Sequence, residues 1–168
     1  SIYIEDEISF TEWMSANVGL RYVMFLTDGK AYNRLEPRAA LRIRLNSKVS
    51  IKMSYSDMNQ FSHRVNASSP LEVPTGFWMP STSEVAPMHS RQYSLGAYFH
   101  LPHNIRIDVE GYYKSMDNIR EYIGISSLYP PLDKWEEDYV SGVGRSYGAD
   151  LLLEWSSKKT LLSLGYTL

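Results

Sequence analysis

The chain has 168 residues, with 17 Lys and Arg against 19 Asp and Glu, so its formal net charge is -2. A nucleic-acid-binding domain usually carries a clear basic excess, so we expect no nucleic acid among its partners. The chain contains no cysteine, which excludes disulfides, thiolate metal sites and a cysteine nucleophile. Its longest run without Asp, Glu, Lys or Arg, residues 92–105, is still shorter than the ~18 apolar residues of a membrane-spanning helix.

Alternation of apolar and polar residues predicts strands along almost the whole chain. In Val49-Ser50-Ile51-Lys52-Met53 every odd position is apolar and every even one polar. Strict alternation is the pattern of strands with one apolar and one polar face, and no segment shows a helical period. The sequence therefore predicts an all-β, antiparallel fold. In chain order the predicted strands are 2–11, 16–26, 37–46, 48–56, 92–101, 105–114, 145–156 and 159–168.

The predicted connections alternate in length. Short links fall at 12–15, at Ser47, at 102–104 and at 157–158, and the long ones are 27–36, 57–91 and 115–144. Short turns on one side and long loops on the other are typical of outer-membrane β-barrels. Strands of about ten residues also suit a tilted crossing of a bilayer. The mean hydropathy of -0.32 fits such a barrel, because only alternate residues touch lipid.

The two faces of the predicted strands suit lipid on one side and water on the other. The apolar face is continuous Leu, Ile, Val, Met and aromatic residues. Charges of both signs on the other face suit a wide lumen. The lumen-facing residues are Arg21, Arg38, Arg42, Arg44, Lys52, Arg106, Asp108, Glu110, Lys114, Asp150 and Glu154. Aromatic residues near strand ends suit an interfacial girdle. These are Tyr22, Tyr55, Tyr93, Tyr113, Tyr147, Trp155 and Tyr166.

Asp6 departs from this pattern, because it falls on the apolar face between Ile4 and Ile8. A β-bulge and a position near the lipid headgroups are both compatible with it. The chain also begins and ends within strand-like alternation, so we expect it to be a piece of a longer protein.

Six segments carry a resemblance to a known family. They are Tyr3-Ile4-Glu5-Asp6-Glu7-Ile8, Gly19-Leu20-Arg21-Tyr22, Leu35-Glu36-Pro37-Arg38-Ala39-Ala40-Leu41-Arg42, Tyr55-Ser56-Asp57-Met58-Asn59-Gln60-Phe61, Glu110-Gly111-Tyr112-Tyr113-Lys114-Ser115-Met116 and Gly142-Val143-Gly144-Arg145-Ser146-Tyr147-Gly148-Ala149-Asp150. In these segments and in their order the chain resembles the carboxy-terminal barrel of TonB-dependent outer-membrane receptors, most closely those of Bacteroides-type bacteria.

The resemblance implies a barrel of about 22 strands around a plug domain, of which this chain supplies about eight. Such receptors bind a scarce nutrient, such as an iron–siderophore, haem, a vitamin or a glycan, and import it with energy relayed by TonB. The plug and the TonB box would lie in the upstream part of the parent protein. The implied partners are outer-membrane lipid, the receptor's own plug, the TonB complex and the nutrient. The lumen arginines are then expected to contact the plug rather than to guide the nutrient.

The sequence shows no pattern of an enzyme or a resident cofactor. His100 and His103 flank Pro102 in a turn, where a solvated role outweighs a zinc site. The run Glu136-Glu137-Asp138 lacks the spacing of a calcium loop. Glycines 142, 144 and 148 are not followed by the Lys-Ser/Thr of a phosphate-binding loop. No nucleophile-elbow pattern accompanies the serines.

Nutrient binding is expected in the long loops, because loops of this length are usually functional or disordered. The candidate ligand-binding residues there are His63, Arg64, Phe77, Trp78, Tyr122, Tyr129 and Trp135. Their aromatic rings suit stacking on a ligand, but packing of the loops against one another or against the rim explains them slightly better.

Two other functions fit the sequence less well. A complete eight-stranded outer-membrane barrel with a structural or adhesive role would place many cations in a lumen just wide enough for side chains. A soluble carbohydrate-binding domain is disfavoured by the large apolar faces and by the loop asymmetry. In isolation, a chain with this lipid face and two strand edges is expected to self-associate.

Overall fold

The computed structural model describes residues 1–66, 76–122, 136 and 139–168, and in this part the chain is almost entirely antiparallel β-sheet. A three-residue 3-10 turn, Pro102–Asn104, joins two of the strands. Among the residues described, no helix is long and apolar enough to cross a membrane. The strands are β1 (Ile2–Thr11), β2 (Met14–Thr27), β3 (Lys30–Arg44), β4 (Val49–Gln60), β5 (Ser62–Asn66), β6 (Gly76–Pro80), β7 (Met88–Leu101), β8 (Ile105–Tyr122), β9 (Tyr139–Ser156) and β10 (Leu161–Thr167).

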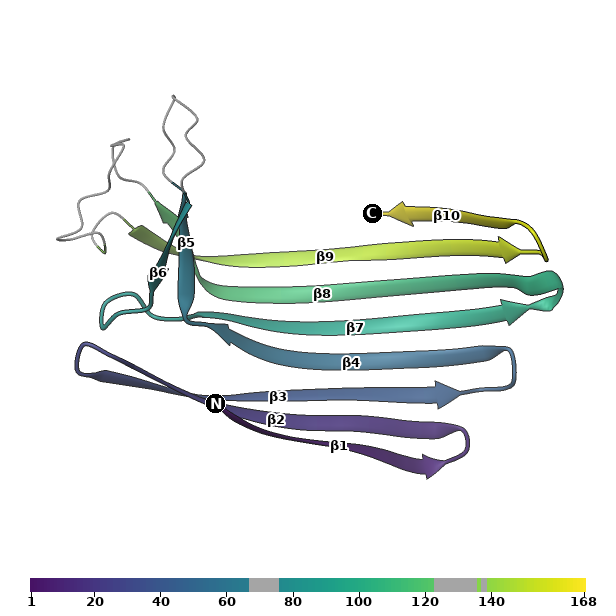
Figure 1. Cartoon of the computed structure of the whole chain (residues 1–168), viewed down its shortest axis with the longest axis horizontal. Helices are drawn as coiled ribbons and strands as arrows, with labels where there is room; N and C mark the ends of the chain where they lie inside the picture. Colours follow the sequence, from purple (N-terminus) through teal and green to yellow (C-terminus); the bar gives the residue numbers. More distant parts are fainter. Residues whose placement is uncertain (67–75, 123–135, 137–138) are drawn as a thin grey trace.

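Eight strands form one open sheet in the order β1-β2-β3-β4-β7-β8-β9-β10, as Figure 1 shows. The predicted all-β, antiparallel fold is thereby confirmed. Short turns join β1 to β2, β3 to β4, β7 to β8 and β9 to β10, and we call that side of the sheet the short-turn end. The opposite side, which carries the β5–β6 hairpin, is the loop end (Figure 1). β1 and β10 lie at opposite edges, so the eight strands do not close into a small barrel of their own in this structure.

Three predicted loops are shorter than expected because the strands continue into them. The predicted link 27–36 is a two-residue turn, Asp28-Gly29, between β2 and β3. Both turn residues have positive φ, 31° and 74°, the conformation of the tight hairpin turns that Asp-Gly favours. Alternation instead predicts that this strand begins at Pro37. Pro37 is tolerated inside β3 because the pairing of β3 with β4 begins only at Arg38.

The second predicted loop, 57–91, contains a hairpin that alternation did not reveal. Strands β5 and β6 pair with each other as a separate two-stranded sheet, while β4 extends to Gln60 and β7 begins at Met88. In the third predicted loop, β8 continues to Tyr122 and β9 begins at Tyr139. A bulge between Asp117 and Ile119 interrupts the period of 2 there, which explains why alternation failed to predict the extension.

Cross-strand register places the predicted lumen residues on one face of the sheet. The pairs Arg42–Lys52, Arg106–Glu154 and Glu110–Asp150 are directly opposed, as are residues of the apolar face such as Leu41 and Met53. Four of the predicted girdle tyrosines form one row on the apolar face, with Tyr55 opposite Tyr93, Tyr93 opposite Tyr113, and Tyr113 opposite Tyr147. The first two rings lie 5.0 Å apart between centroids.

Asp6 stays on the apolar face, opposite Val18. The register of β1 with β2 is regular from Ile2 to Ser9, and the irregularity of this pair lies between Ser9 and Thr11. A bulge therefore does not account for Asp6.

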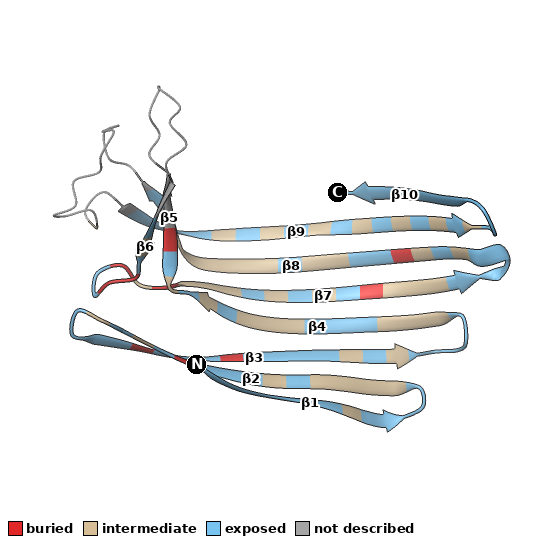
Figure 2. Cartoon of the chain, in the orientation of Figure 1, coloured by how far each residue is buried: buried red, intermediate tan, exposed pale blue. Residues whose placement is uncertain are grey.

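Burial in the described residues is concentrated at the loop end, as Figure 2 shows. The buried hydrophobic residues there are Val23, Tyr32 and Val85, whereas apolar side chains along the sheet such as Leu20, Leu95 and Leu164 are exposed. The apolar face of this sheet is thus not the core of a soluble domain. Exposed apolar area of this extent marks a surface that another apolar phase or partner covers.

Candidate functional site

The loop end holds a compact assembly built on the segment between β6 and β7. Ser81 donates its backbone N–H to the carbonyl of Phe61 at 2.7 Å, which fixes the start of this segment beside the end of β4. The hydroxyl of Thr82 accepts hydrogen bonds from the backbone N–H groups of Glu84 and Val85. Such side-chain-to-backbone bonds stabilise a tight turn. The segment Ser81–Pro87, which we call the rim segment, is therefore ordered locally by its own residues.

The β2–β3 hairpin holds the rim segment from the other side. The buried Tyr32 hydroxyl donates to the carbonyl of Thr82 at 2.7 Å, and the Lys30 ammonium donates to the carbonyl of Ser83 at 3.1 Å. Phe25 stacks on Phe61 with ring centroids 5.1 Å apart. The extended ends of β2 and β3 are thereby joined to the rim segment and to Phe61, which lie far from them in the sequence.

The side chain of His63, one of the predicted ligand-binding residues, is buried, with 2% of its surface exposed. Its Nε2 lies 2.9 Å from the Ser81 hydroxyl, and its Nδ1 has no hydrogen-bond partner among the described residues. Burial, and after it the positive charge of Arg120, lowers the pKa of His63 below its ordinary value. His63 therefore packs beneath the rim segment.

Arg120, near the loop end of β8, is half-buried and lies close to His63. Its guanidinium donates to the carbonyl of Ala86 at 3.5 Å, while its Nε has no hydrogen-bond partner among the described residues. Burial lowers the pKa of Arg120. Asn118, in the β8 bulge, donates to the carbonyl of Pro87 at 3.1 Å. Neither Arg120 nor Asn118 is marked by its local sequence, because nothing local indicates that β8 reaches the rim segment.

The other predicted ligand-binding residues are distributed around this assembly. Trp78 lies in β6 with 63% of its surface exposed, opposite Arg64 in the β5–β6 register. Phe77 is the neighbour of Trp78 in β6, and Tyr122 ends β8. Tyr129 and Trp135 lie outside the described residues. A ligand-binding role for these residues stays a prediction.

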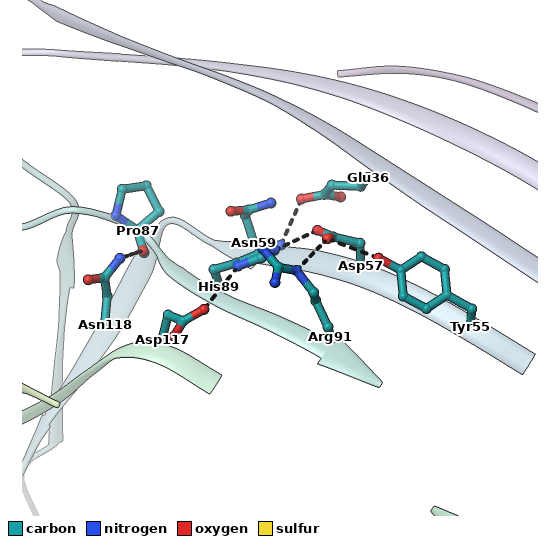
Figure 3. Close-up of polar contacts among 9 residues, drawn as sticks. All are labelled: Glu36, Tyr55, Asp57, Asn59, Pro87, His89, Arg91, Asp117 and Asn118. Carbon is teal, nitrogen blue, oxygen red and sulfur yellow. Dashed lines mark hydrogen bonds and ion pairs between the residues drawn. The ribbon is translucent and has the colours of Figure 1, made fainter. Parts of the chain in front are cut away.

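A second polar group on the apolar side of the sheet lies just beyond the tyrosine row (Figure 3). His89 lies between two carboxylates, with Nε2 2.8 Å from Asp57 Oδ1 and Nδ1 3.5 Å from Asp117 Oδ2. Arg91 Nε lies 3.5 Å from Asp57, whose carboxylate also accepts a hydrogen bond from Tyr55. Among the described residues, no group of three or more His, Cys, Asp or Glu is arranged to hold a metal ion. The group marks where the lipid-compatible surface ends, because charges replace apolar residues on the same face.

The predicted lumen residues form several ion pairs across strands. Arg21 lies 3.7 Å from Glu36, Arg38 lies 3.8 Å from Glu5, and Arg106 lies 3.6 Å from Glu154. Arg106 also donates two hydrogen bonds to Asp108, its neighbour two positions along β8. Glu36 in addition accepts the backbone N–H of Asn59 at 2.8 Å (Figure 3). Several charged side chains of the polar face are thus held by ion pairs with neighbouring strands or residues.

Comparisons with known proteins agree with this architecture. The model of the family described as "TonB dependent receptor-like, beta-barrel" matches residues 1–168. Among solved structures, the chain is similar to the alcaligin outer membrane receptor FauA from Bordetella pertussis, with a TM-score of 0.57 and 18% sequence identity. The match covers 99% of this chain and 29% of that receptor, and at this identity it shows the fold. No curated protein matches the chain significantly.

Proposed function

The chain belongs to the TonB-dependent receptor β-barrel family, and on that premise we propose that it forms part of the wall of a receptor that imports a scarce nutrient. The family places it in the bacterial outer membrane. The single observation that carries the proposal is the match of the family over all 168 residues. The chain spans 29% of the length of the similar solved receptor, so import is proposed for the parent protein rather than for this sheet alone.

The two faces of the sheet give each surface a role in this proposal. The apolar face with its tyrosine row contacts lipid, and the polar face lines the lumen, where a plug domain sits. The short-turn end then faces the periplasm, where TonB acts, and the loop end faces the outside. The rim segment and the β5–β6 hairpin accordingly lie where the nutrient first meets the receptor.

Among the nutrient classes, a siderophore is the first to test, because the similar solved receptor is named for alcaligin. Cells that carry the parent receptor are expected to accumulate a labelled iron–siderophore. Deletion of the receptor gene, or of tonB, should abolish that uptake. Uptake that persists in cells without TonB would contradict active import. Uptake that persists in cells without the receptor gene would show that this receptor does not import the siderophore.

The exposed Trp78 allows a residue-level test of ligand binding at the loop end. Trp78→Ala is expected to weaken nutrient affinity by about tenfold, the effect of losing about 1.4 kcal/mol of contact energy. Trp13→Ala is a matched control, because Trp13 is 52% exposed but lies in a turn at the short-turn end. Binding titrations on the purified receptor measure both variants. Equal losses for the two variants would show that Trp78 has no special role.

A further inference from the structure

On the apolar side of the sheet, the row next to the tyrosine row carries two arginines with a small residue between them. One step toward the loop end, register places Asp57 opposite Arg91, Arg91 opposite Ser115, and Ser115 opposite Arg145. Neighbouring strands lie about 4.8 Å apart, so the backbones of the two arginines are about 10 Å apart. The surface over Ser115 can therefore be reached by a guanidinium from each side.

The positive charge of this row lies at the surface. The side chain of Arg91 is 50% exposed, and Arg145 is also exposed. Arg91 is held through its Nε, which lies 3.5 Å from the carboxylate of Asp57 (Figure 3). That carboxylate is only 11% exposed, and Asp117, one level farther toward the loop end, contacts His89. Asp57 thus positions Arg91, while the two arginines form the outward part of the row.

On the other side of the tyrosine row, toward the short-turn end, the apolar face is hollowed. The hollow has a volume of about 530 Å³ and is bordered by Tyr93 and Tyr113. Because apolar side chains line it on this face, burial of a hydrocarbon chain there is favourable. These side chains are Leu95, Ala97, Val109 and Ala149.

Gly111 lies in this hollow, although the backbone does not require a glycine there. Its φ is not positive, and a Cβ at this position would lie 3.8 Å from the nearest heavy atom, the carbonyl oxygen of Gly148. That distance is an ordinary contact, so the sheet itself accepts a side chain at position 111. A large side chain would instead fill the hollow. The glycine therefore keeps open a space that the fold does not need.

The hollow and the arginine row are aligned along one strand. Gly111, Tyr113 and Ser115 stand at alternate positions of β8 and so share one face. Residues two apart on a strand are about 6.6 Å apart, which places Ser115 about 13 Å from Gly111. Along this line the surface changes from apolar to aromatic to cationic. The same order leads from the hydrocarbon of a membrane through its aromatic belt to the headgroups.

We infer that this strip of β8 binds one anionic lipid of the outer leaflet, with a hydrocarbon chain in the hollow over Gly111 and a phosphate over Ser115, between Arg91 and Arg145. The inference rests on the proposed function, in which the apolar face contacts lipid. Guanidinium groups bind phosphate oxygens through strong, charge-assisted hydrogen bonds. A free phosphate ion would use the arginines but not the hollow, so the two features together indicate a lipid.

Lipid retention by the purified parent receptor tests the inference. The receptor is placed in phosphatidylcholine nanodiscs that contain a small fraction of dioleoyl phosphatidic acid as the probe. Dioleoylglycerol, which has the same chains and no phosphate, replaces the probe in a parallel sample. Native mass spectrometry then measures the lipid that stays bound when the receptor is released from the nanodisc. The receptor should retain several-fold more phosphatidic acid than dioleoylglycerol.

Substitution of an arginine tests the phosphate end of the site. Arg145→Gln should lower retention of phosphatidic acid several-fold and leave retention of dioleoylglycerol unchanged. Arg145→Lys keeps the charge and should retain more phosphatidic acid than Arg145→Gln does. Lys114→Gln is the matched control, because Lys114 is the neighbour of Ser115 on β8 but belongs to the opposite face.

Substitution of Gly111 tests the hydrocarbon end. Gly111→Leu fills the hollow and should lower retention of both lipids. Gly165→Leu is its control, because a Cβ at Gly165 also meets open space, but Gly165 lies opposite Leu152 on the polar side of the sheet.

Three results overturn the inference. The first is equal retention of the two lipids, and the second is an equal effect of Arg145→Gln and Lys114→Gln. The third is unchanged retention of phosphatidic acid in Gly111→Leu, because the arginines would then bind phosphate without a lipid chain. Nutrient uptake reports on the proposed function separately. Loss of uptake with selective lipid retention intact would contradict import, whereas unselective retention with uptake intact would contradict only the lipid site.

Discussion

At the scale of single residues, the burial of His63 changes the role expected of its side chain. A histidine in a long, aromatic-rich loop predicted a ligand contact, yet here its imidazole is buried against Ser81 under the rim segment. Burial, and after it the positive charge of the nearby Arg120, makes a charged imidazole unfavourable at this place. The neutral form of His63 is therefore the one that the packing requires.

The lowered pKa of His63 predicts that the rim segment loosens in acid. A base whose pKa is lower in the folded state binds fewer protons there, so its packing is most stable above the unfolded-state pKa of about 6.5. That stability is lost progressively as the pH falls below this value. Hydrogen exchange of the amides of residues 81–86, corrected for intrinsic rates, should show increasing opening between pH 7.5 and 5.5.

Substitution tests the assignment to His63. His63→Gln keeps a donor for Ser81 but does not titrate, so the additional opening in acid should disappear. His100→Gln, a change at an exposed position of the short-turn end, should leave it intact. An identical acid response in His63→Gln and the unsubstituted chain would show that another group is responsible.

At the scale of elements, the long β2–β3 hairpin supports the loops rather than the sheet. Its tight Asp28-Gly29 turn allows both strands to pass beyond the main sheet, where Tyr32 and Lys30 contact the rim segment. Alternation alone places the start of β3 at Pro37 instead of Lys30, because Pro37 suggests a strand start. An Asp-Gly pair between two alternating runs is a hairpin signal, and it was present in the sequence.

The Tyr32 hydroxyl is expected to be the main hydrogen-bonding contact between hairpin and rim segment. Tyr32→Phe leaves the buried carbonyl of Thr82 without this donor, at a cost of about 1–3 kcal/mol in local stability. Limited proteolysis should cleave the rim segment at least several-fold faster in this variant. Tyr22→Phe is the matched control, because the Tyr22 hydroxyl bonds Asn33 at 2.7 Å on the exposed part of the same hairpin. Equal cleavage rates in the two variants would refute this role.

At the scale of the whole molecule, the sheet has little interior of its own. Side chains such as Leu35, Leu95 and Leu164 remain exposed on the apolar face, and β1 and β10 each pair with a single neighbour. Lipid on one face and the rest of a barrel along both edges would complete it. The strand number of the parent barrel and the resemblance to Bacteroides-type receptors stay predictions.

The isolated 168-residue chain is therefore expected to require detergent or lipid. In plain buffer it should elute as large aggregates in size-exclusion chromatography with light scattering. Detergent micelles should convert a substantial part of it to a dispersed form with the circular dichroism of β-sheet. A stable monomer in plain buffer would contradict a lipid-facing role for the apolar face.

The sequence by itself determined the fold class, the eight sheet strands and the two faces. The reason is geometric. Side chains alternate between the two faces with a period of 2, so the face of each residue follows from the local sequence of its strand. The tyrosines of the row and the cations of the lumen were accordingly assigned to their faces from local pattern.

Only the tertiary structure decided which residues meet across strands. The opposed pairs Arg42–Lys52 and Glu110–Asp150, and the burial of His63 near Arg120, depend on register between segments distant in the chain. A period of 2 fixes the face of a side chain but not its level along a neighbouring strand. That level is set by turns, bulges and packing of the whole sheet, which is why the charge pattern of the lumen became visible only in three dimensions.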